Sequence, residues 1–339
     1  MKFGIHILPT YMPDVEGALP DFYQQMFEQI IEVERLGFDQ AWVTEHHFGG
    51  YGGSLPHPPT FLSAVACKTS RIRLGVAVAV LPLHDPLQLA EAYAMADVIS
   101  KGRLDFGIGK GSEPVEYRKF GLNREEANGR FAEEAEIIRQ AWSSGPVNFR
   151  GEFYRIEGVD ILPKPVQRPH PPIWVGATRS EETFRWAGKN GYDLMTVPFV
   201  HPSTDALRDL VRLYRHELSA NGHDFVGSEV LGKFHIYVSD SLERGMREAA
   251  PFMKNYSDIH KSVDPNRTLT ERDIGSDMAR GFIVVGDPAR CSDTIERWHR
   301  EAGITTFSGT FHFGGMPPEM ALKNLRLFAE RVMPSLASL

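Results

Sequence analysis

Leu74-Gly75-Val76-Ala77-Val78-Ala79-Val80 is an unbroken apolar run, which is typical of a β-strand buried on both faces. We predict this strand over residues 72–80 and seven further strands at residues 3–8, 40–44, 104–108, 173–175, 193–196, 230–238 and 305–311. Segments with helical spacing lie between them, at residues 22–36, 60–68, 86–100, 124–142, 181–189, 204–220 and 289–301. Eight strand–helix units predict an α/β protein with a closed (β/α)8 barrel, known as a TIM barrel. A doubly wound open sheet is the alternative, but no dinucleotide-binding fingerprint follows the first strand.

The composition is that of an ordinary globular protein. The chain has 339 residues, 42% hydrophobic and 24% charged, so we expect one domain over residues 1–339. A net charge of −7 argues against nucleic-acid and anionic-membrane partners, which require basic surfaces. The two cysteines, Cys67 and Cys291, exclude a disulfide framework and a four-thiolate zinc site. The best apolar run, residues 74–83, is about half of the roughly 20 residues that a membrane helix needs, and no secretory signal opens the chain, so we expect a cytoplasmic protein.

Two segments interrupt the alternation of strands and helices. For residues 149–172 we predict a small hairpin around residues 151–156 and then a proline-rich connection. Residues 239–280 form an insertion after the seventh strand, with a helix near residues 242–256 and a polar stretch, 257–278, that has no clear periodicity. Long loops inside compact domains are usually functional or disordered.

Thr44-Glu45-His46-His47-Phe48 follows the second strand, at the edge of the barrel where ligands bind. Successive strand residues point to opposite faces, so at most one of the two histidines can face a given pocket. The alternative to a catalytic role for His46 is a structural histidine that hydrogen-bonds to a backbone carbonyl. The alternative for Glu45 is a solvated loop carboxylate. Adjacent histidines diverge, and the chain has no helical His-Glu-x-x-His arrangement, so we expect no metal site.

Gly176-Ala177-Thr178-Arg179-Ser180-Glu181-Glu182-Thr183 joins the fifth strand to its helix. Small residues and hydroxyl groups at a helix N-terminus favour an anion, because free N–H groups and the helix dipole point there. Helix capping by Ser180 alone is the alternative interpretation.

Four stretches in order along the chain resemble the bacterial luciferase family of flavin-dependent monooxygenases. These are residues 44–48, Leu81-Pro82-Leu83-His84-Asp85-Pro86, residues 100–111 and the C-terminal residues 327–334. The resemblance implies a TIM barrel with an insertion after the seventh strand, in which residues 257–278 would form a mobile lid that excludes water from the flavin. It also implies that reduced FMN binds at the barrel mouth and reacts with O2 through a C4a-hydroperoxyflavin to oxygenate an aldehyde, ketone or similar small substrate.

The resemblance also assigns roles to residues. His46 matches a histidine implicated in proton transfer beside the flavin, and Glu45 would orient His46 or a ring edge of the cofactor. A cis peptide bond at Ala77-Val78 would lie under the flavin ring. Lys110, where the family has an arginine, would lie near the FMN phosphate together with Gly176, Arg179, Ser180 and Thr183. Arg130 matches a further family arginine, with a surface ion pair to Glu133 or Glu134 as the alternative.

The expected partners also come from the resemblance: a separate flavin reductase, O2 and a second copy of the chain, which would dock through helices 60–68 and 86–100. Three rival functions remain open. One is an oxidoreductase that uses the deazaflavin F420 for hydride transfer, although its members commonly carry Asp-His where this chain has Glu45-His46. The second is a non-catalytic flavin-binding protein, which tends to lack barrel units. The third is a metal-dependent barrel hydrolase, for which the spaced ligands are missing.

Overall fold

The computed structural model describes residues 1–261 and 271–339 of the chain. It contains a closed barrel of eight parallel strands, in the spatial order in which they occur in the sequence. The barrel strands are β1 (Lys2–Ile7), β2 (Gln40–Val43), β3 (Arg73–Val80), β4 (Leu104–Gly109), β7 (Ile173–Gly176), β8 (Asp193–Thr196), β9 (Val230–Val238) and β11 (Thr306–Thr310). The predicted TIM barrel is therefore confirmed, and β1 closes it by pairing with β11.

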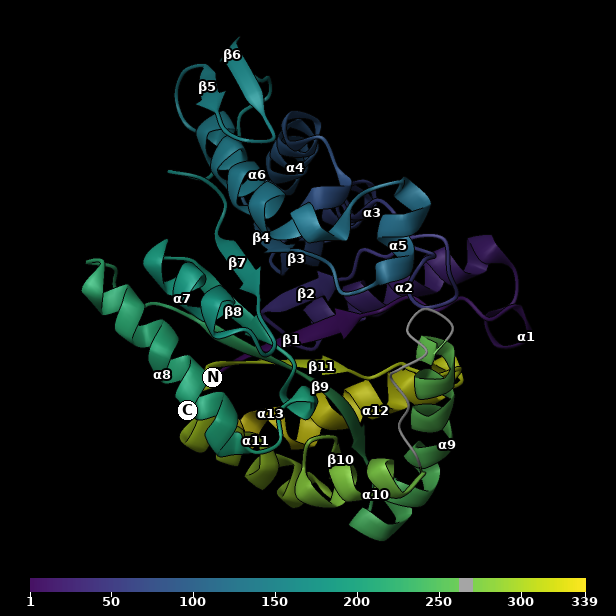
Figure 1. Ribbon diagram of the computed structural model, residues 1–339. Coiled ribbons are helices and arrows are strands. Elements are labelled where there is room, and N and C mark those ends of the chain that lie inside the picture. The colour runs from purple at the N-terminus through teal and green to yellow at the C-terminus, as the bar shows by residue number, and fades with distance from the viewer. Residues whose placement is uncertain (262–270) are drawn as a thin grey trace.

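Helices surround the strands on the outside (Figure 1). They are α1 (Pro13–Glu16), α2 (Leu19–Arg35), α3 (Pro58–Ala66), α4 (Pro86–Ser100), α5 (Pro114–Phe120), α6 (Ala127–Trp142), α7 (Glu181–Lys189), α8 (Thr204–Ala220), α11 (Pro288–Ala302), α12 (Pro318–Arg331) and α13 (Met333–Leu336). Short 3-10 turns lie at η1 (Leu81–Leu83), η2 (Arg124–Glu126) and η3 (Pro198–Val200). None of the described helices is both long and apolar enough to cross a membrane.

The expected hairpin is present as β5 (Val147–Arg150) and β6 (Arg155–Val159), an antiparallel pair that projects beyond α6 (Figure 1). The insertion after β9 differs from the expectation of a polar stretch without periodicity. Helix α9 (Leu242–Lys261) is longer than predicted, and α10 (Glu271–Arg280) and strand β10 (Val284–Gly286) follow. Their buried residues, including Met253, Ile274 and Met278, form an apolar cluster of their own. The central part of the expected lid, residues 262–270, lies outside the described residues.

Large side chains fill the middle of the barrel. Trp42 and Trp174 meet edge to face with ring centroids 5.2 Å apart, and Met195 and Leu231 pack with them. Gly75 makes room for this layer, because a Cβ atom there would lie 2.2 Å from the Trp42 ring. The barrel is thus a packed core with an open mouth, and the mouth is where a ligand can bind.

Candidate active site

A cavity of about 350 Å³ opens at the carboxyl ends of the barrel strands. Residues that directly follow β2, β4, β7 and β8 line its walls, and Met195 and Leu231 form part of its lining from inside the barrel. The volume lies in the range of small-molecule and cofactor sites. The fold therefore places the strand-end motifs predicted from sequence around one common space.

His46 lines this cavity, and a carboxylate holds its ring. Its Nδ1 lies 3.1 Å from Oε1 of Glu116, a buried residue of α5 that also accepts a hydrogen bond from the backbone N–H of His47. Because a carboxylate oxygen accepts, we assign the hydrogen of the ring contact to Nδ1. Nε2 is then the nitrogen that remains for proton transfer. The sequence interpretation missed Glu116, since α5 was not predicted.

The loop after β2 adapts closely to His46. Gly52 has φ +70°, a backbone conformation that side chains rarely adopt, and a Cβ atom there would lie 2.7 Å from Cδ2 of His46. The Tyr51 ring packs against the imidazole, with centroids 5.1 Å apart. Both neighbours limit rotation of the ring, so His46 presents a fixed orientation to the cavity.

Glu45 contacts two other histidines and not His46, so the first of its two expected roles is wrong, and the second, orientation of a ring edge of the cofactor, stays a prediction. Its Oε1 lies 2.6 Å from Nε2 of His84 and 3.2 Å from Nε2 of His47. Burial alone would raise the pKa of Glu45, but the hydrogen bonds from the two histidines hold it below its usual value. Burial would lower the pKa of His84, yet the hydrogen bond and charge of Glu45 raise it. These residues form an ion-paired cluster that holds the loop after β2 against the turn after β3.

The same three residues are a group whose possible ligand atoms lie within 4.8 Å of one another, which raises the question of a metal. Two ligand atoms that share a tetrahedral Zn²⁺ at about 2.0–2.1 Å lie more than about 3 Å apart. The 2.6 Å contact between Glu45 and His84 is too short for that arrangement and has the length of a charge-assisted hydrogen bond. A hydrogen-bonded cluster therefore accounts for this geometry.

The predicted anion site forms a second part of the cavity wall. Gly176, Ser180, Thr183 and Lys110 all line the cavity, and Nζ of Lys110 donates to Oγ1 of Thr183 over 3.3 Å. The Ser180 side chain makes no capping hydrogen bond to α7, so capping does not account for this residue. Burial lowers the pKa of Lys110. A lysine, two hydroxyl groups and a helix N-terminus at one place can bind a phosphate.

Two predicted arginines do not line the cavity. Nε of Arg179 donates to the backbone carbonyl of Val200 over 3.0 Å. Arg130 forms an ion pair of 2.8 Å with Glu126, one helical turn away, and packs on the ring of Phe153. Its partner is thus neither of the two glutamates considered from sequence. The i,i+4 spacing on α6 explains this pair.

The peptide bond between Ala77 and Val78 is cis, as the resemblance implied, and both residues line the cavity. Sequence reasoning missed several other lining residues: His6, Tyr51, Lys233 and Tyr256. A lysine inside the apolar run 230–238 was the one signal that could have been noticed.

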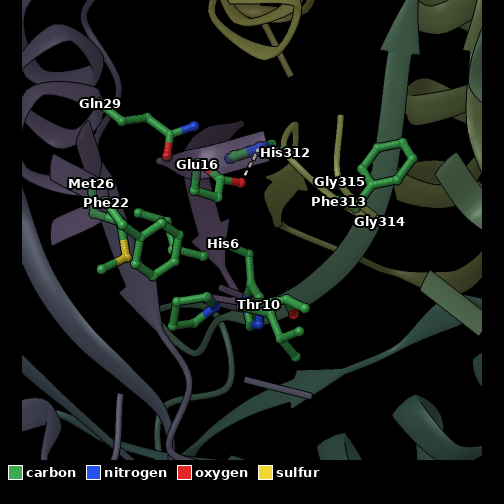
Figure 2. A pocket seen from close by; sticks show the side chains of 13 residues that line it. His6, Thr10, Glu16, Phe22, Met26, Gln29, His312, Phe313, Gly314 and Gly315 are labelled. Atoms are coloured by element: carbon green, nitrogen blue, oxygen red, sulfur yellow. Dashed lines mark ion pairs between the residues drawn. The ribbon is translucent and has the colours of Figure 1, made fainter. Parts of the chain in front are cut away.

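A second, much smaller cavity of about 30 Å³ lies beside the first and shares His6 with it. Figure 2 shows Glu16 and His312 facing each other across this space, where Oε1 of Glu16 lies 3.3 Å from Nε2 of His312. Its volume suits one ordered water rather than an organic ligand. The cavity of about 350 Å³ is the candidate active site because the strand-end motifs meet there.

Comparison with known proteins gives the site its context. Residues 1–306 match the family described as luciferase-like monooxygenase. The chain is 31% identical over 245 residues, 72% of this chain and 66% of the other, to the oxygenase component of the flavin-dependent trigonelline monooxygenase of Acinetobacter baylyi. The crystal structure of monooxygenase RslO1 from Streptomyces bottropensis has a TM-score of 0.90 at 30% identity and covers 99% of this chain and 100% of its own.

A more distant structure shares the fold. The FMN complex of the oxygenating constituent of 3,6-diketocamphane monooxygenase from Pseudomonas putida has a TM-score of 0.81 at 18% identity, over 98% of both chains. That likeness shows the fold alone, whereas the family match is a match of sequence and covers residues 1–306. The chain therefore belongs to the luciferase-like monooxygenase family.

Proposed function

We propose that this protein is a monooxygenase that uses reduced FMN and O2 to oxygenate a small organic substrate. One observation carries the proposal: a single cavity contains an imidazole held by a buried carboxylate, His46 with Glu116, and also an anion site around Lys110. Reduced FMN, when bound, would supply the electrons and the atom at which O2 is activated.

The residues present fit the cofactor. Lys110, Ser180 and Thr183 would hold the phosphate, together with the first amides of α7. A lysine acts there as a point charge and not as a bidentate fork. Gly176 makes room for the Val78 side chain, because a Cβ atom on Gly176 would lie 2.9 Å from Cγ1 of Val78, and both residues line the cavity.

His46 would move the proton that oxygen transfer requires. Its Nδ1 is engaged by Glu116, so Nε2 would hold or release the proton at the reacting atoms. The ring of Tyr51 beside it would keep water from that side of the imidazole.

Two partners belong to the same proposal. The chain has no glycine-rich dinucleotide motif after its first strand, so a separate flavin reductase would supply reduced FMN. Helix α4 exposes Met95, Val98 and Ile99, which supports a homodimer through α3 and α4. Light scattering coupled to gel filtration tests the dimer, and a monomer at micromolar concentration would contradict it.

Anaerobic titration with reduced FMN, followed by admission of O2, tests the function. We expect saturable binding, and then O2 uptake with transfer of one ¹⁸O atom to an added organic substrate. A parallel titration with reduced F420 tests the alternative function, an F420-dependent oxidoreductase that transfers hydride. Tight binding of F420 with no use of O2 would favour that function, and flavin binding with no turnover on any substrate would favour a binding protein.

A further inference from the structure

His6 connects the candidate active site with the smaller cavity beside it. This residue of β1 is 7% exposed and lines both the cavity of about 350 Å³ and the cavity of about 30 Å³. Its Nδ1 is enclosed and has no hydrogen-bond partner among the residues that the structure describes. Buried polar atoms are almost always paired with protein groups or with ordered water. We therefore expect a water molecule at this nitrogen.

Glu16 brings a second enclosed atom to the same small cavity (Figure 2). Its side chain is 2% exposed, and its Oε1 lies 3.3 Å from Nε2 of His312. Its Oε2 is enclosed and, within the described part of the chain, has no hydrogen-bond partner. The cavity of about 30 Å³ has room for a water. A water between Oε2 of Glu16 and Nδ1 of His6 would satisfy both atoms at once.

The small cavity adjoins a groove of about 330 Å³ between α2 and α12. Glu16, Gln29 and His312 line both spaces. The side chain of His312 is 24% exposed, so its ring exchanges protons with solvent directly. Glu16 and His312 follow β1 and β11, which are paired strands, and this explains why two residues so far apart in the sequence meet. Polar groups therefore lie one after another from the outer surface to the candidate active site.

The imidazole of His6 has the properties that proton transfer needs. Burial, followed by the charges of Lys233 and His46, lowers the pKa of His6 well below its usual value, so the ring is neutral at physiological pH. A neutral imidazole has one nitrogen that donates and one that accepts, so it can take up a proton on one side while it releases one on the other. Because His6 lines both cavities, its ring can exchange protons with each of them.

We propose that Glu16, a water molecule and His6 form a proton relay that leads from the groove to the candidate active site. Glu16 takes up a proton from the groove and passes one to the water, the water passes one to Nδ1 of His6, and the other ring nitrogen releases its proton into the large cavity. One proton enters and one leaves, so the relay has the same charge before and after the transfer. A half-turn of the imidazole then restores the first tautomer.

The relay rests on the proposed function, because the reaction proposed there consumes protons. When one atom of O2 enters the substrate, the other becomes water, which takes up two protons and the two electrons that reduced FMN supplies. The proton that His6 releases into the cavity replaces the one that His46 passes to the reacting atoms. Protons can then arrive from solvent while bound ligands keep bulk water out of the cavity mouth.

Hydrogen exchange at His6 tests the relay without any turnover. NMR of protein with ¹⁵N-labelled histidine, with and without oxidised FMN, measures how fast the ring hydrogen of His6 exchanges with solvent, and His6→Gln assigns the signal. We expect exchange to be at least about fivefold slower in Glu16→Gln than in the wild type, because an amide does not accept and release protons as a carboxylate does. Glu28→Gln is the matched control, since Glu28 lines the groove but not the small cavity, and it should exchange like the wild type.

Turnover with reduced FMN then connects the relay with the reaction. Glu16→Gln should lower turnover by about tenfold, increase the solvent deuterium isotope effect and leave flavin affinity within about twofold. Added imidazole should restore part of this turnover, because a small proton carrier can enter through the mouth of the large cavity. Glu28→Gln should keep the turnover of the wild type and should not respond to imidazole.

Three results would overturn the relay: equal exchange at His6 in the wild type and in Glu16→Gln, unchanged turnover in Glu16→Gln, or a loss of turnover that imidazole does not restore. If Glu16→Gln did not fold, Glu16→Asp, which draws the carboxylate back by one methylene group, would replace it in both measurements. Failure of the wild type to bind reduced FMN or to use O2, with slower exchange in Glu16→Gln intact, would instead contradict the proposed function and leave the relay standing.

Discussion

Glu45 and Glu116 are two buried carboxylates that each contact histidines at the mouth of the barrel, but they contact different histidines and have different roles. Glu116 engages the ring of His46, which faces the cavity, and the backbone of the next residue. Glu45 engages the rings of His47 and His84 and joins two loops. The same pair of residue types thus orients a reactive ring in one place and fastens the scaffold in the other.

The largest expected effect comes from removing the oriented ring. His46→Ala should lower turnover by roughly 10²–10⁴-fold and leave flavin affinity within about tenfold, because general acid–base groups contribute to the reaction more than to binding. Steady-state rates with reduced FMN and a flavin titration measure both. His47→Ala is the control, and an equal loss of turnover there would remove the distinction between the two histidines.

Neutralising the carboxylate behind His46 should have a smaller effect. Glu116→Gln keeps a hydrogen-bond acceptor near Nδ1 but removes the charge, so turnover should fall by about 10–10²-fold with a changed pH–rate profile. Glu45→Gln, measured in the same assay, should reduce turnover less. An equal loss of turnover in Glu116→Gln and Glu45→Gln would contradict the different roles given to these two carboxylates.

Glu45→Gln should act mainly on stability, with a loss of about 3 kcal/mol, because it leaves the charged, partly buried His84 without its carboxylate partner. The pKa of His84 is raised, so its contribution is complete below about pH 6.5 and is lost as pH rises through the folded value. The pKa of Glu45 is lowered, so its contribution is lost as pH falls below about 4.5. Urea unfolding of the wild type and of Glu45→Gln at several pH values measures this pH dependence. If the free energy of unfolding changed with pH in the same way for both proteins, the ion pair between Glu45 and His84 would be contradicted.

Glu134 sharpens the comparison, since this buried carboxylate has the Tyr154 hydroxyl as its partner and no histidine. Burial raises its pKa to about 7, despite the hydrogen bond from Tyr154. Glu134 then binds its proton more strongly in the folded than in the unfolded state between pH 4.5 and 7, so its contribution to wild-type stability should fall by about 2 kcal/mol from pH 5 to pH 7. Glu134→Gln should make the free energy of unfolding depend less on pH between pH 5 and pH 7. An unchanged pH dependence would show that other titratable groups cause it.

The barrel could be predicted because its signals are local. The apolar run 74–80 and the helix-spaced segments each reveal one element, and a parallel barrel is their simplest arrangement. The positions of Lys110, Ser180 and Thr183 at the cavity could be predicted because the first two lie in strand-end loops and Thr183 lies in the first turn of α7. The pairing of His46 with Glu116 could not, because 70 residues separate them and a short helix supplies the carboxylate. The side-chain directions of Arg130 and Arg179 likewise depend on neighbours that spacing does not reveal.

Pairing of the first strand with the last has a consequence for synthesis on the ribosome. Lys2 of β1 aligns with Thr306 of β11, so the ring of strands cannot close until nearly the whole chain has emerged. At about 5–20 residues per second, the first strand waits roughly 15–60 s for its neighbour. During that interval the nascent sheet has an open edge, which is a template for pairing with other chains. A circular permutant that begins at β9 should therefore keep the same chaperone dependence of expression, because β9 would then wait for β8, its other neighbour in the barrel.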